Sequence, residues 1–177
     1  MQTGDIPAAA EFLNACWRAA YAGILDAGFL DAMTTQTRID ILSEKLSRGL
    51  CGLIASDDDG AMIGVAMYGP THLRILGDAG EINMIYVRPD HIGTGLGHVL
   101  FAQAEAALIG HGYSTLGLDV FSANLRAVRF YESHGYVRVG GKTDVMQGHE
   151  YPLDIMSRSV DTDASTAAVD AVCRTAR

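Results

Sequence analysis

The sequence is poor in cysteine and has no long hydrophobic run, and both absences exclude classes of protein. Its 177 residues include three cysteines, too few and too scattered for a disulfide framework or a zinc site. The six histidines show no metal-ligand spacing, so we expect no metal. No apolar run approaches the roughly 18 residues of a membrane span, and the first residues lack the pattern of a signal peptide. These absences predict a cytoplasmic protein without a membrane partner.

Charge is sparse and mostly of one sign. Charged residues make up 19% of the chain, and 21 acidic against 13 basic side chains give a formal net charge of -8. Such a chain is a poor candidate for binding a nucleic acid, and it suits a cationic partner better without identifying one. Hydrophobic residues reach 49%, which is a globular composition. The length favours one domain with a core of its own.

Hydrophobic periodicity predicts the order of helices and strands. An apolar face with helical spacing, capped by Asp5 and ended by Gly23, predicts the first helix. We expect further helices over 37–46, 96–111 and 124–134, and strands over 51–55, 61–68, 81–87, 115–120, 136–139 and 151–157. This order favours a mixed sheet with one parallel crossover. The domain would span residues 1–158, and a disordered tail would follow over 159–177.

Three glycines at alternate positions separate a predicted strand from a predicted helix. Gly93, Gly95 and Gly97 let the backbone turn tightly and let a ligand approach the main chain. The free N–H groups and the dipole of the following helix favour a negative group there, which suits a pyrophosphate. The spacing G-x-G-x-G is not the G-x-G-x-x-G of a dinucleotide fold, and no Walker A loop is present. By itself, the pattern also fits a plain tight turn.

Two segments around this turn resemble the GNAT family of N-acetyltransferases. The first is the strand end YVRP at residues 86–89 together with Gly95 and Gly97, which is similar to the family's cofactor motif R/Q-x-x-G-x-G/A. The second is the segment from Asn124 to Tyr136, which resembles the family pattern N-x-x-A-x-x-x-Y-x-x-x-G-[FY]. A weaker resemblance extends over almost the whole predicted domain.

The resemblance implies an α/β fold and a co-substrate. The fold is a central mixed, mostly antiparallel sheet with a splayed parallel strand pair, flanked by helices. Acetyl-CoA as co-substrate would lie between the strands that end at Val87 and Val120. Ile92 stands where the family has arginine or glutamine, so His91 or His98 would compensate for it. The implied cofactor-binding residues are Ile85, Tyr86, Val87, Ile92, Gly93, Thr94, Gly95, Leu96, Gly97, His98, Asn124 and Tyr131.

The implied activity is transfer of an acetyl group from acetyl-CoA to a primary amine, by direct attack in a ternary complex. The amine would belong to a small molecule or a peptide N-terminus, and a polyamine, an aminoglycoside-like drug, an amino acid and a protein N-terminus all stay open. A homodimer is open as well, since many relatives form dimers. Two other readings compete: a non-catalytic acyl-CoA-binding module of the same fold, and an ordinary α/β ligand-binding domain whose glycines only form a turn.

Asn124 and Tyr131 are seven residues apart, so on a helix they lie within about 20° of the same face. The resemblance assigns the pantetheine arm to Asn124 and the thioester sulfur to the hydroxyl of Tyr131. A tyrosine with a pKa near 10 is protonated at neutral pH and can give its proton to the departing thiolate. A core tyrosine with a satisfied hydroxyl is the alternative. No cysteine nucleophile is needed, and Cys16 and Cys51 are expected to be packing residues in apolar surroundings.

Two acidic residues compete as the general base that takes a proton from the amine. Polar side chains on a central strand are costly unless partnered, and the family often keeps a glutamate at the position of Glu81. We favour Glu81 as the base, with Asp119 as the competing candidate, and a role at the solvent edge is the alternative for Glu81. The alternation of a strand places Glu81 and Asn83 on one face, and on the other face Ile82, Met84 and Tyr86.

The first predicted helix carries the candidates for the wall of the acceptor pocket, Trp17 and Tyr21, with Asn83 as a further substrate-binding residue. The helical spacing of the two aromatic residues favours core packing instead. The family's first strand would precede this helix, where only residues 1–4 stand. That strand is therefore expected to be short or missing, which leaves a sheet edge open to pairing.

Overall fold

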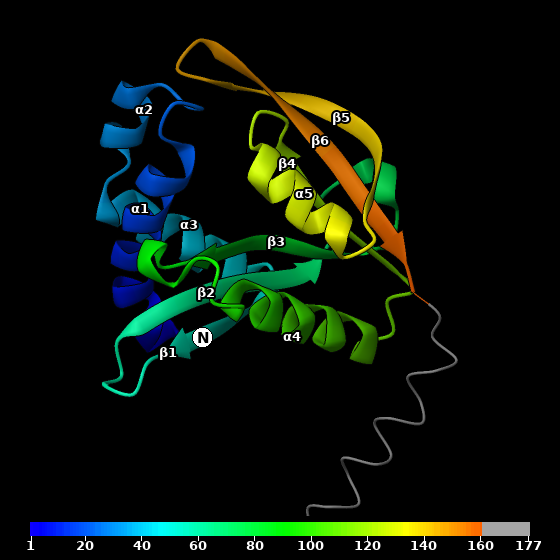
Figure 1. The fold of residues 1–177 in the computed structure, drawn as a ribbon, viewed down its shortest axis with the longest axis horizontal. Helices are drawn as coiled ribbons and strands as arrows, with labels where there is room; N and C mark the ends of the chain where they lie inside the picture. The colour runs from blue at the N-terminus through cyan, green and yellow to red at the C-terminus, as the bar shows by residue number, and fades with distance from the viewer. Residues whose placement is uncertain (161–177) are drawn as a thin grey trace, which may run out of the picture.

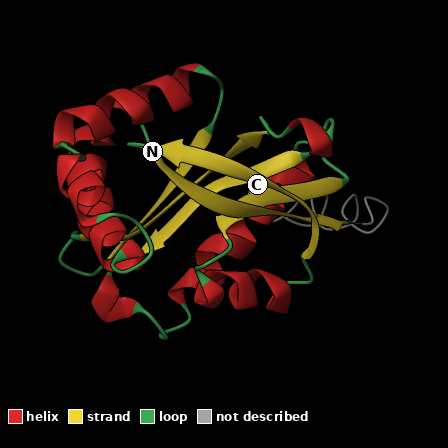
Figure 2. Ribbon diagram, turned by 90° about the horizontal axis from the view of Figure 1, so that it is seen from above, coloured by secondary structure: helices red, strands yellow, loops and turns green. Residues whose placement is uncertain are grey.

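The computed structural model describes residues 1–160, in which a six-stranded sheet carries helices on both faces (Figures 1 and 2). The strands, β1 (Cys51–Ser56), β2 (Met62–Pro70), β3 (Gly80–Val87), β4 (Thr115–Phe121), β5 (Val137–Met146) and β6 (His149–Ser159), lie in the order β1-β2-β3-β4-β6-β5. The helices are α1 (Ile6–Tyr21), α2 (Ala27–Ala32), α3 (Thr35–Ser47), α4 (Leu96–Gly110) and α5 (Leu125–Ser133). Residues 161–177, most of the predicted tail, lie outside the described residues.

Two apolar clusters hold helices to opposite faces of the sheet. On one face, Phe101 and Leu108 of α4 are buried against β2, β3 and β4. On the other face, Leu13 of α1 and Leu42 of α3 pack against Val65 of β2. These contacts remove the apolar stripe of each helix from water, which is the main favourable term in its folding. The four helices predicted from periodicity are confirmed within two residues at each end.

The parallel strand pair is short, and this opens the sheet. β3 and β4 pair only through Gly80 with Leu116 and Glu81 with Gly117. Beyond this point β3 stays paired with β2 as far as Val87, while β4 stays paired with β6 as far as Phe121. The two strands therefore diverge, and the main chain of residues 82–87 has no strand neighbour on the β4 side. The predicted mixed sheet with a splayed parallel pair is confirmed.

A β-bulge at Asn83 changes which side chains face each helix layer. Met67 of β2 pairs with Met84, but the next residue of β2 pairs with Ile82, so Asn83 is an extra residue in β3. Ile82 packs in the cluster of α4, whereas Met84 and Tyr86 pack with α1 and α3. The expectation that these three residues share one face is therefore wrong, because the bulge interrupts the alternation of the strand.

Several local features differ from the sequence prediction. β5 continues for seven residues beyond residue 139, because a bulge and two glycines at 140–141 hide its alternation. The six-residue α2, capped by Asp26, was not predicted. Asp5 stands at the N-cap of α1 as predicted, but its carboxylate accepts the N–H of Gln2 and forms no capping bond to the helix. Cys51 is exposed on β1 rather than packed.

The expected lack of a strand before α1 holds for residues 1–160, where only a 3₁₀ turn (Thr3–Asp5) precedes this helix. β1 is accordingly an edge strand of the sheet. The amino group of Met1 donates a hydrogen bond to the carbonyl of Gly52 in β1. This contact covers one point of that edge.

Aromatic rings fix α5 against α4. Phe101 of α4 is 0% exposed, and its ring centroid lies 5.3 Å from that of Phe130 and 5.6 Å from that of Tyr131, both on α5. The same ring lies 5.5 Å from the buried ring of Tyr136, which follows α5. Such aromatic pairs stabilise the fold by more than the burial of their apolar area alone. The position of α5 along the sheet therefore depends on Phe101.

We expect Phe101→Ala to lower the free energy of unfolding by about 3–5 kcal/mol, because it removes a fully buried ring and leaves a cavity. Val99→Ala on the same helix is the matched control, since Val99 is 55% exposed and its truncation changes stability by less than about 0.5 kcal/mol. Urea unfolding of the three proteins measures both effects. Equal stabilities of the two variants would contradict this description of the core.

Candidate active site

The divergence of β3 and β4 opens into a cavity of about 580 Å³. Its walls come from α1, β3, the loop before α4, the first turn of α4, β4 and α5. Of the predicted site residues, the cavity is lined by Tyr21, Asn83, Ile85, Tyr86, Val87, Ile92, Gly93, Gly95, Gly97, His98, Asp119, Asn124 and Tyr131. Four others, Trp17, Glu81, Thr94 and Leu96, are not part of its lining.

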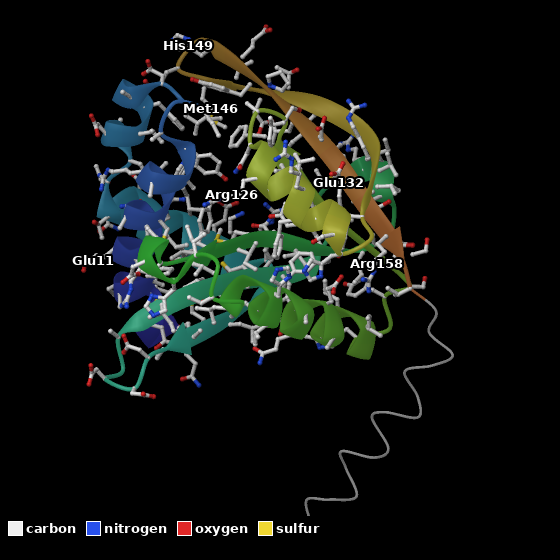
Figure 3. All side chains as sticks on the ribbon, in the orientation of Figure 1. Glu11, Arg126, Glu132, Met146, His149 and Arg158 are labelled. Carbon is white, nitrogen blue, oxygen red and sulfur yellow. The ribbon has the colours of Figure 1, made fainter. Side chains whose placement is uncertain are left out.

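Some lining residues were not predicted. Arg126 stands at the start of α5, between this helix and β3, and is exposed (Figure 3). Phe130 lies on the same helix, but six residues beyond Asn124 and one before Tyr131 turn it roughly 100–120° away from both, so helical spacing gave no signal for it. Cys16 and Ala20 of α1 and Leu153 of β6 come from elements far apart in the sequence. No local pattern could have placed these three together.

The glycine-rich turn presents bare backbone to the cavity. Gly93 and Gly95 have φ of +85° and +92°, a region that favours glycine. His98 and Val99 already donate their N–H groups to the carbonyl of Gly95. Within residues 1–160, no hydrogen bond uses the N–H groups of Gly93, Gly95, Leu96 or Gly97. With the positive end of the α4 dipole, these donors make a binding place for a phosphate group.

Asn124 begins α5, because its side-chain oxygen accepts the N–H of Ala127 at 3.2 Å. This capping bond fixes the orientation of the side chain, and its amide NH₂ is left to face the cavity that Asn124 lines. Tyr131, on the next turns of the helix, also lines the cavity. The helical spacing therefore does bring the two side chains to one space, as predicted.

Three tyrosines supply hydroxyl groups to the cavity lining. Burial raises the pKa of Tyr131, and the nearby Tyr21 and Asp119 raise it further. Burial likewise raises the pKa of Tyr21 and of Tyr86, whose hydroxyl oxygens are 3.1 Å apart. All three side chains are therefore protonated at neutral pH, and their hydroxyl groups can donate hydrogen bonds. Cys16 adds a thiol 3.7 Å from the carbonyl oxygen of Val87, and burial raises its pKa to about 11, so it is not a thiolate.

Glu81 is buried and fully engaged. Its side chain is 1% exposed and accepts hydrogen bonds from the hydroxyl of Thr71, the N–H and Nδ1 of His72, and the amide of Asn83. Burial alone would raise the pKa of Glu81, but these hydrogen bonds, led by that of His72, lower it to about 2. The hydrogen bond to Glu81 in turn raises the pKa of His72. A carboxylate that holds its charge this firmly, outside the cavity lining, is poorly suited to receive a proton from a substrate.

The same network extends to α3. Lys45 donates to the side-chain oxygen of Asn83 at 2.6 Å, while Asn83 donates to Glu81 at the same distance. Burial lowers the pKa of Lys45. Glu81 also belongs to the last pair between β3 and β4. The network therefore ties the bulge, the β2–β3 loop and α3 together where the cavity opens.

Asp119 is the acidic residue that reaches the cavity. It lines the cavity from β4, and its Oδ2 lies 2.6 Å from Nζ of Lys142 on β5. Burial lowers the pKa of Lys142, but its contact with Asp119 outweighs this and raises it. Met146, at the tip of the β5–β6 hairpin, packs against the apolar cluster of Leu25, Leu30, Phe121 and Leu153, beside α2 (Figure 3).

Trp17 packs within α1, α2 and α3 rather than on the cavity wall. Its ring meets those of Tyr21 and Phe29 edge-on, with centroids 5.7 Å and 5.9 Å away. The guanidinium of Arg38 stacks on it, 3.9 Å from the centroid. Trp17 thus supports Tyr21, which does line the cavity.

The described residues contain neither a membrane-spanning helix nor a cluster of metal-binding side chains. Over residues 1–160 no helix has the length and apolar character needed to cross a membrane. The same part of the chain holds no group of three or more histidine, cysteine, aspartate or glutamate side chains arranged to bind a metal ion.

Comparison with known proteins agrees with this geometry. A family model described as the acetyltransferase (GNAT) family matches residues 10–136. An uncharacterized N-acetyltransferase of Bacillus subtilis (strain 168) is 27% identical over 123 residues, which are 70% of this chain and 69% of that protein.

Solved structures share the fold. The crystal structure of a ribosomal-protein-alanine N-acetyltransferase from Brucella melitensis superimposes with a TM-score of 0.69 at 21% identity, covering 90% of this chain and 97% of that one. The PaiA N-acetyltransferase of Thermoplasma acidophilum, solved in complex with coenzyme A, gives a TM-score of 0.65 at 19% identity, with coverage of 90% and 96%. At these identities the likeness concerns the fold.

The buried carboxylate predicts an acid-sensitive stability. Because the pKa of Glu81 is about 2 in the folded chain against an ordinary 4.5, its contribution is complete above pH 4.5 and is lost as the pH falls towards 2. We expect Glu81→Gln to cost about 1–3 kcal/mol at pH 7 and less at pH 4. Urea unfolding at both pH values measures the difference. Glu132→Gln, at an exposed residue of α5 (Figure 3), is the control. A stability difference between the wild type and Glu81→Gln that is the same at both pH values would contradict the lowered pKa of Glu81.

Proposed function

The chain belongs to the acetyltransferase (GNAT) family, and we propose that it transfers the acetyl group of acetyl-CoA to a primary amine. It is an acetyl-CoA-dependent acyltransferase. The observation that carries the finer proposal is the cavity itself. One continuous cavity is lined by the unpaired main chain of β3, by the glycine turn that can bind a phosphate group, and by the protonated Tyr131. A CoA thioester has the matching parts: an extended pantetheine arm, a pyrophosphate at one end of this arm and, at its other end, the sulfur that leaves.

The main chain of β3 would hold the pantetheine arm. Residues 82–87 have no strand neighbour on the β4 side, so their free groups can pair with an extended ligand as with an added strand. Asn124 would contact the arm from α5 through the amide that its capping bond leaves free. The unpaired N–H groups of the glycine turn would bind the pyrophosphate. Coenzyme A in the Thermoplasma acidophilum relative supports this use of the fold.

The bulged strand would polarise the thioester. The extra residue of a bulge is not paired in the ladder, so a main-chain N–H near Asn83 to Ile85 is available to the acetyl carbonyl oxygen. The amine attacks the carbonyl carbon directly, and the carbon–sulfur bond breaks. Tyr131, held protonated by burial, gives its proton to the departing thiolate. Cys16 is a neutral thiol and therefore a weak nucleophile, and direct attack by the amine requires no acetyl-cysteine intermediate.

Asp119 is the base that the geometry favours over Glu81. It lines the cavity, whereas Glu81 is outside the lining and is engaged by four donor groups. Lys142 contacts Asp119 at Oδ2, and the carboxylate that faces the cavity can orient the ammonium of the acceptor and receive its proton. Glu81 then has a supporting role, in which it holds Asn83 and the bulge in place.

Aromatic and acidic groups together suit an amine acceptor. Tyr21 and Phe121 line the cavity near Asp119, and their rings pack edge-on with centroids 5.2 Å apart. Aromatic faces beside a carboxylate attract ammonium groups. The acceptor can be a small molecule or a peptide N-terminus, and thiol release from acetyl-CoA with a polyamine, free amino acids and a short peptide separates these classes. If acetyl-CoA binds but no thiol is released in the presence of any of these amines, the non-catalytic acyl-CoA-binding module would be favoured.

A charge at the glycine turn should abolish cofactor binding. A Cβ at position 97 would meet Val87 at 3.8 Å and Phe130 at 3.9 Å, which is ordinary contact, so Gly97→Glu is expected to fold. Its carboxylate would repel the pyrophosphate by several kcal/mol, and we expect acetyl-CoA to bind roughly 100-fold more weakly or worse. Gly110→Glu, at the far end of α4 in open space, is the matched control. Titration calorimetry measures both, and equal affinity of the two variants would contradict the assignment.

Loss of one hydroxyl should slow the chemical step. We expect Tyr131→Phe to lower kcat by roughly 100-fold, with little change in KM for acetyl-CoA, because it removes the proton donor but keeps the ring that packs on Phe101. Tyr113→Phe removes a hydroxyl outside the cavity lining and is the control. The assay is thiol release with the best acceptor of the panel. A kcat within twofold of the wild type would assign the proton transfer elsewhere.

A further inference from the structure

Two imidazole rings meet where α4 begins and α5 ends. Nδ1 of His98 lies 2.8 Å from Nε2 of His134, and the rings are stacked with centroids 5.0 Å apart. His98 lines the cavity directly after Gly97, beside the unpaired N–H groups of the turn. His134 is the residue that ends α5. The pair therefore connects the phosphate end of the cavity to the helix that carries Tyr131.

The hydrogen bond between the rings places one proton between them. Burial lowers the pKa of His134, and the neighbouring His98 and Arg158 lower it further, so His134 is the neutral ring of the pair. We assign the shared proton to Nδ1 of His98, with Nε2 of His134 as its acceptor. This assignment leaves Nε2 of His98 as the atom that can take up a second proton. A neutral histidine that fixes the tautomer of another in this way sets the direction of its free nitrogen.

The surroundings leave a positive charge on His98 without a protein partner. No carboxylate of residues 1–160 forms an ion pair with it, because Asp90 contacts Arg88 and His91, and Glu105 of α4 contacts Arg158 of β6. Phe101 and Phe130 provide the apolar contacts around the two rings. The other charged groups of these elements are Arg126, which lines the cavity, and Arg129 and Glu132, which are exposed and do not.

We propose that His98 takes up a proton at Nε2 when coenzyme A binds and contacts its pyrophosphate, with His134 as the positioning residue that holds the Nδ1 proton. This inference rests on the proposed function. An imidazole in the first turn of a helix is disfavoured as a cation by the helix dipole, and a bound anion reverses that preference. His98 thereby supplies the positive group that the exposed, apolar Ile92 cannot supply.

The test is calorimetric titration with dephospho-CoA, which keeps the pyrophosphate but lacks the phosphomonoester that titrates near pH 6. Runs in two buffers of different ionisation enthalpy give the number of protons taken up. We expect the wild type to take up a proton at pH 7.5, and its Kd to rise roughly threefold to tenfold from pH 6.5 to 8.5. His98→Gln should show neither effect. His111→Gln, an exposed histidine that ends α4, should behave as the wild type.

Variants of His134 separate positioning from simple packing. His134→Gln keeps a side-chain acceptor for the Nδ1 proton and should retain proton uptake, whereas His134→Leu fills the space without one and should lose it. Circular dichroism confirms that each variant is folded. Tight binding by the wild type with no proton uptake, or uptake that persists in His98→Gln, would overturn the proposal and leave the proposed function standing. No binding of either CoA or dephospho-CoA at any pH would instead refute the proposed function.

Discussion

Everything in the site depends on where β3 and β4 stop pairing. Two adjacent pairs, ending at Glu81 and Gly117, hold the strands together, and beyond them each strand keeps only its outer partner. A sheet normally satisfies every main-chain donor and acceptor, so an internal strand with a free side is a costly arrangement. Here that cost coincides with a cavity, and the free main chain of β3 forms one of its walls.

The protein builds a separate support on each side of this opening. On the α4 side, Phe101 packs against rings from α5 and fixes the helix that carries Tyr131. On the α3 side, Lys45, Asn83 and Glu81 form one hydrogen-bonded network at the bulge. The aromatic packing is apolar and the network is charged, so the two supports respond to different conditions. Acid weakens the network, while the aromatic packing is indifferent to pH.

The division of labour between the two carboxylates follows from burial and partners. Glu81 and Asp119 both lie on the central strands near the opening. Four donor groups fix the charge of Glu81, and a single lysine contacts Asp119, which faces the cavity. A base must be free to change its protonation state during turnover, and a structural carboxylate must not. The polar strand residue that stood out in the sequence is thus the one better suited to hold the site together.

Local sequence patterns predicted much of the fold, and they predicted those parts of the site that depend on spacing within a single element. The glycine turn and the pair Asn124 and Tyr131 were found because each depends on spacing within one element, and the cavity lining includes them. The bulge was missed, since a register shift at Asn83 depends on how β2 pairs and not on β3 alone. Sequence reasoning placed Glu81 above Asp119 as the base, because it cannot see the burial and the hydrogen-bond partners that distant loops and strands supply. The length of β5 was underestimated, because two glycines interrupt the alternation of its side chains.

Amide hydrogen exchange with and without coenzyme A tests most directly whether the free side of β3 binds the cofactor. Ligand binding slows global opening everywhere, so the exchange of β1 provides the reference. We predict that coenzyme A slows two sets of amides beyond that reference: those of residues 83–87 that do not pair with β2, and those of Gly93 and residues 95–97. These main-chain groups gain partners only in the complex. Tight binding of coenzyme A with no added protection in residues 83–87 would show that the splayed strand is not the cofactor's binding edge.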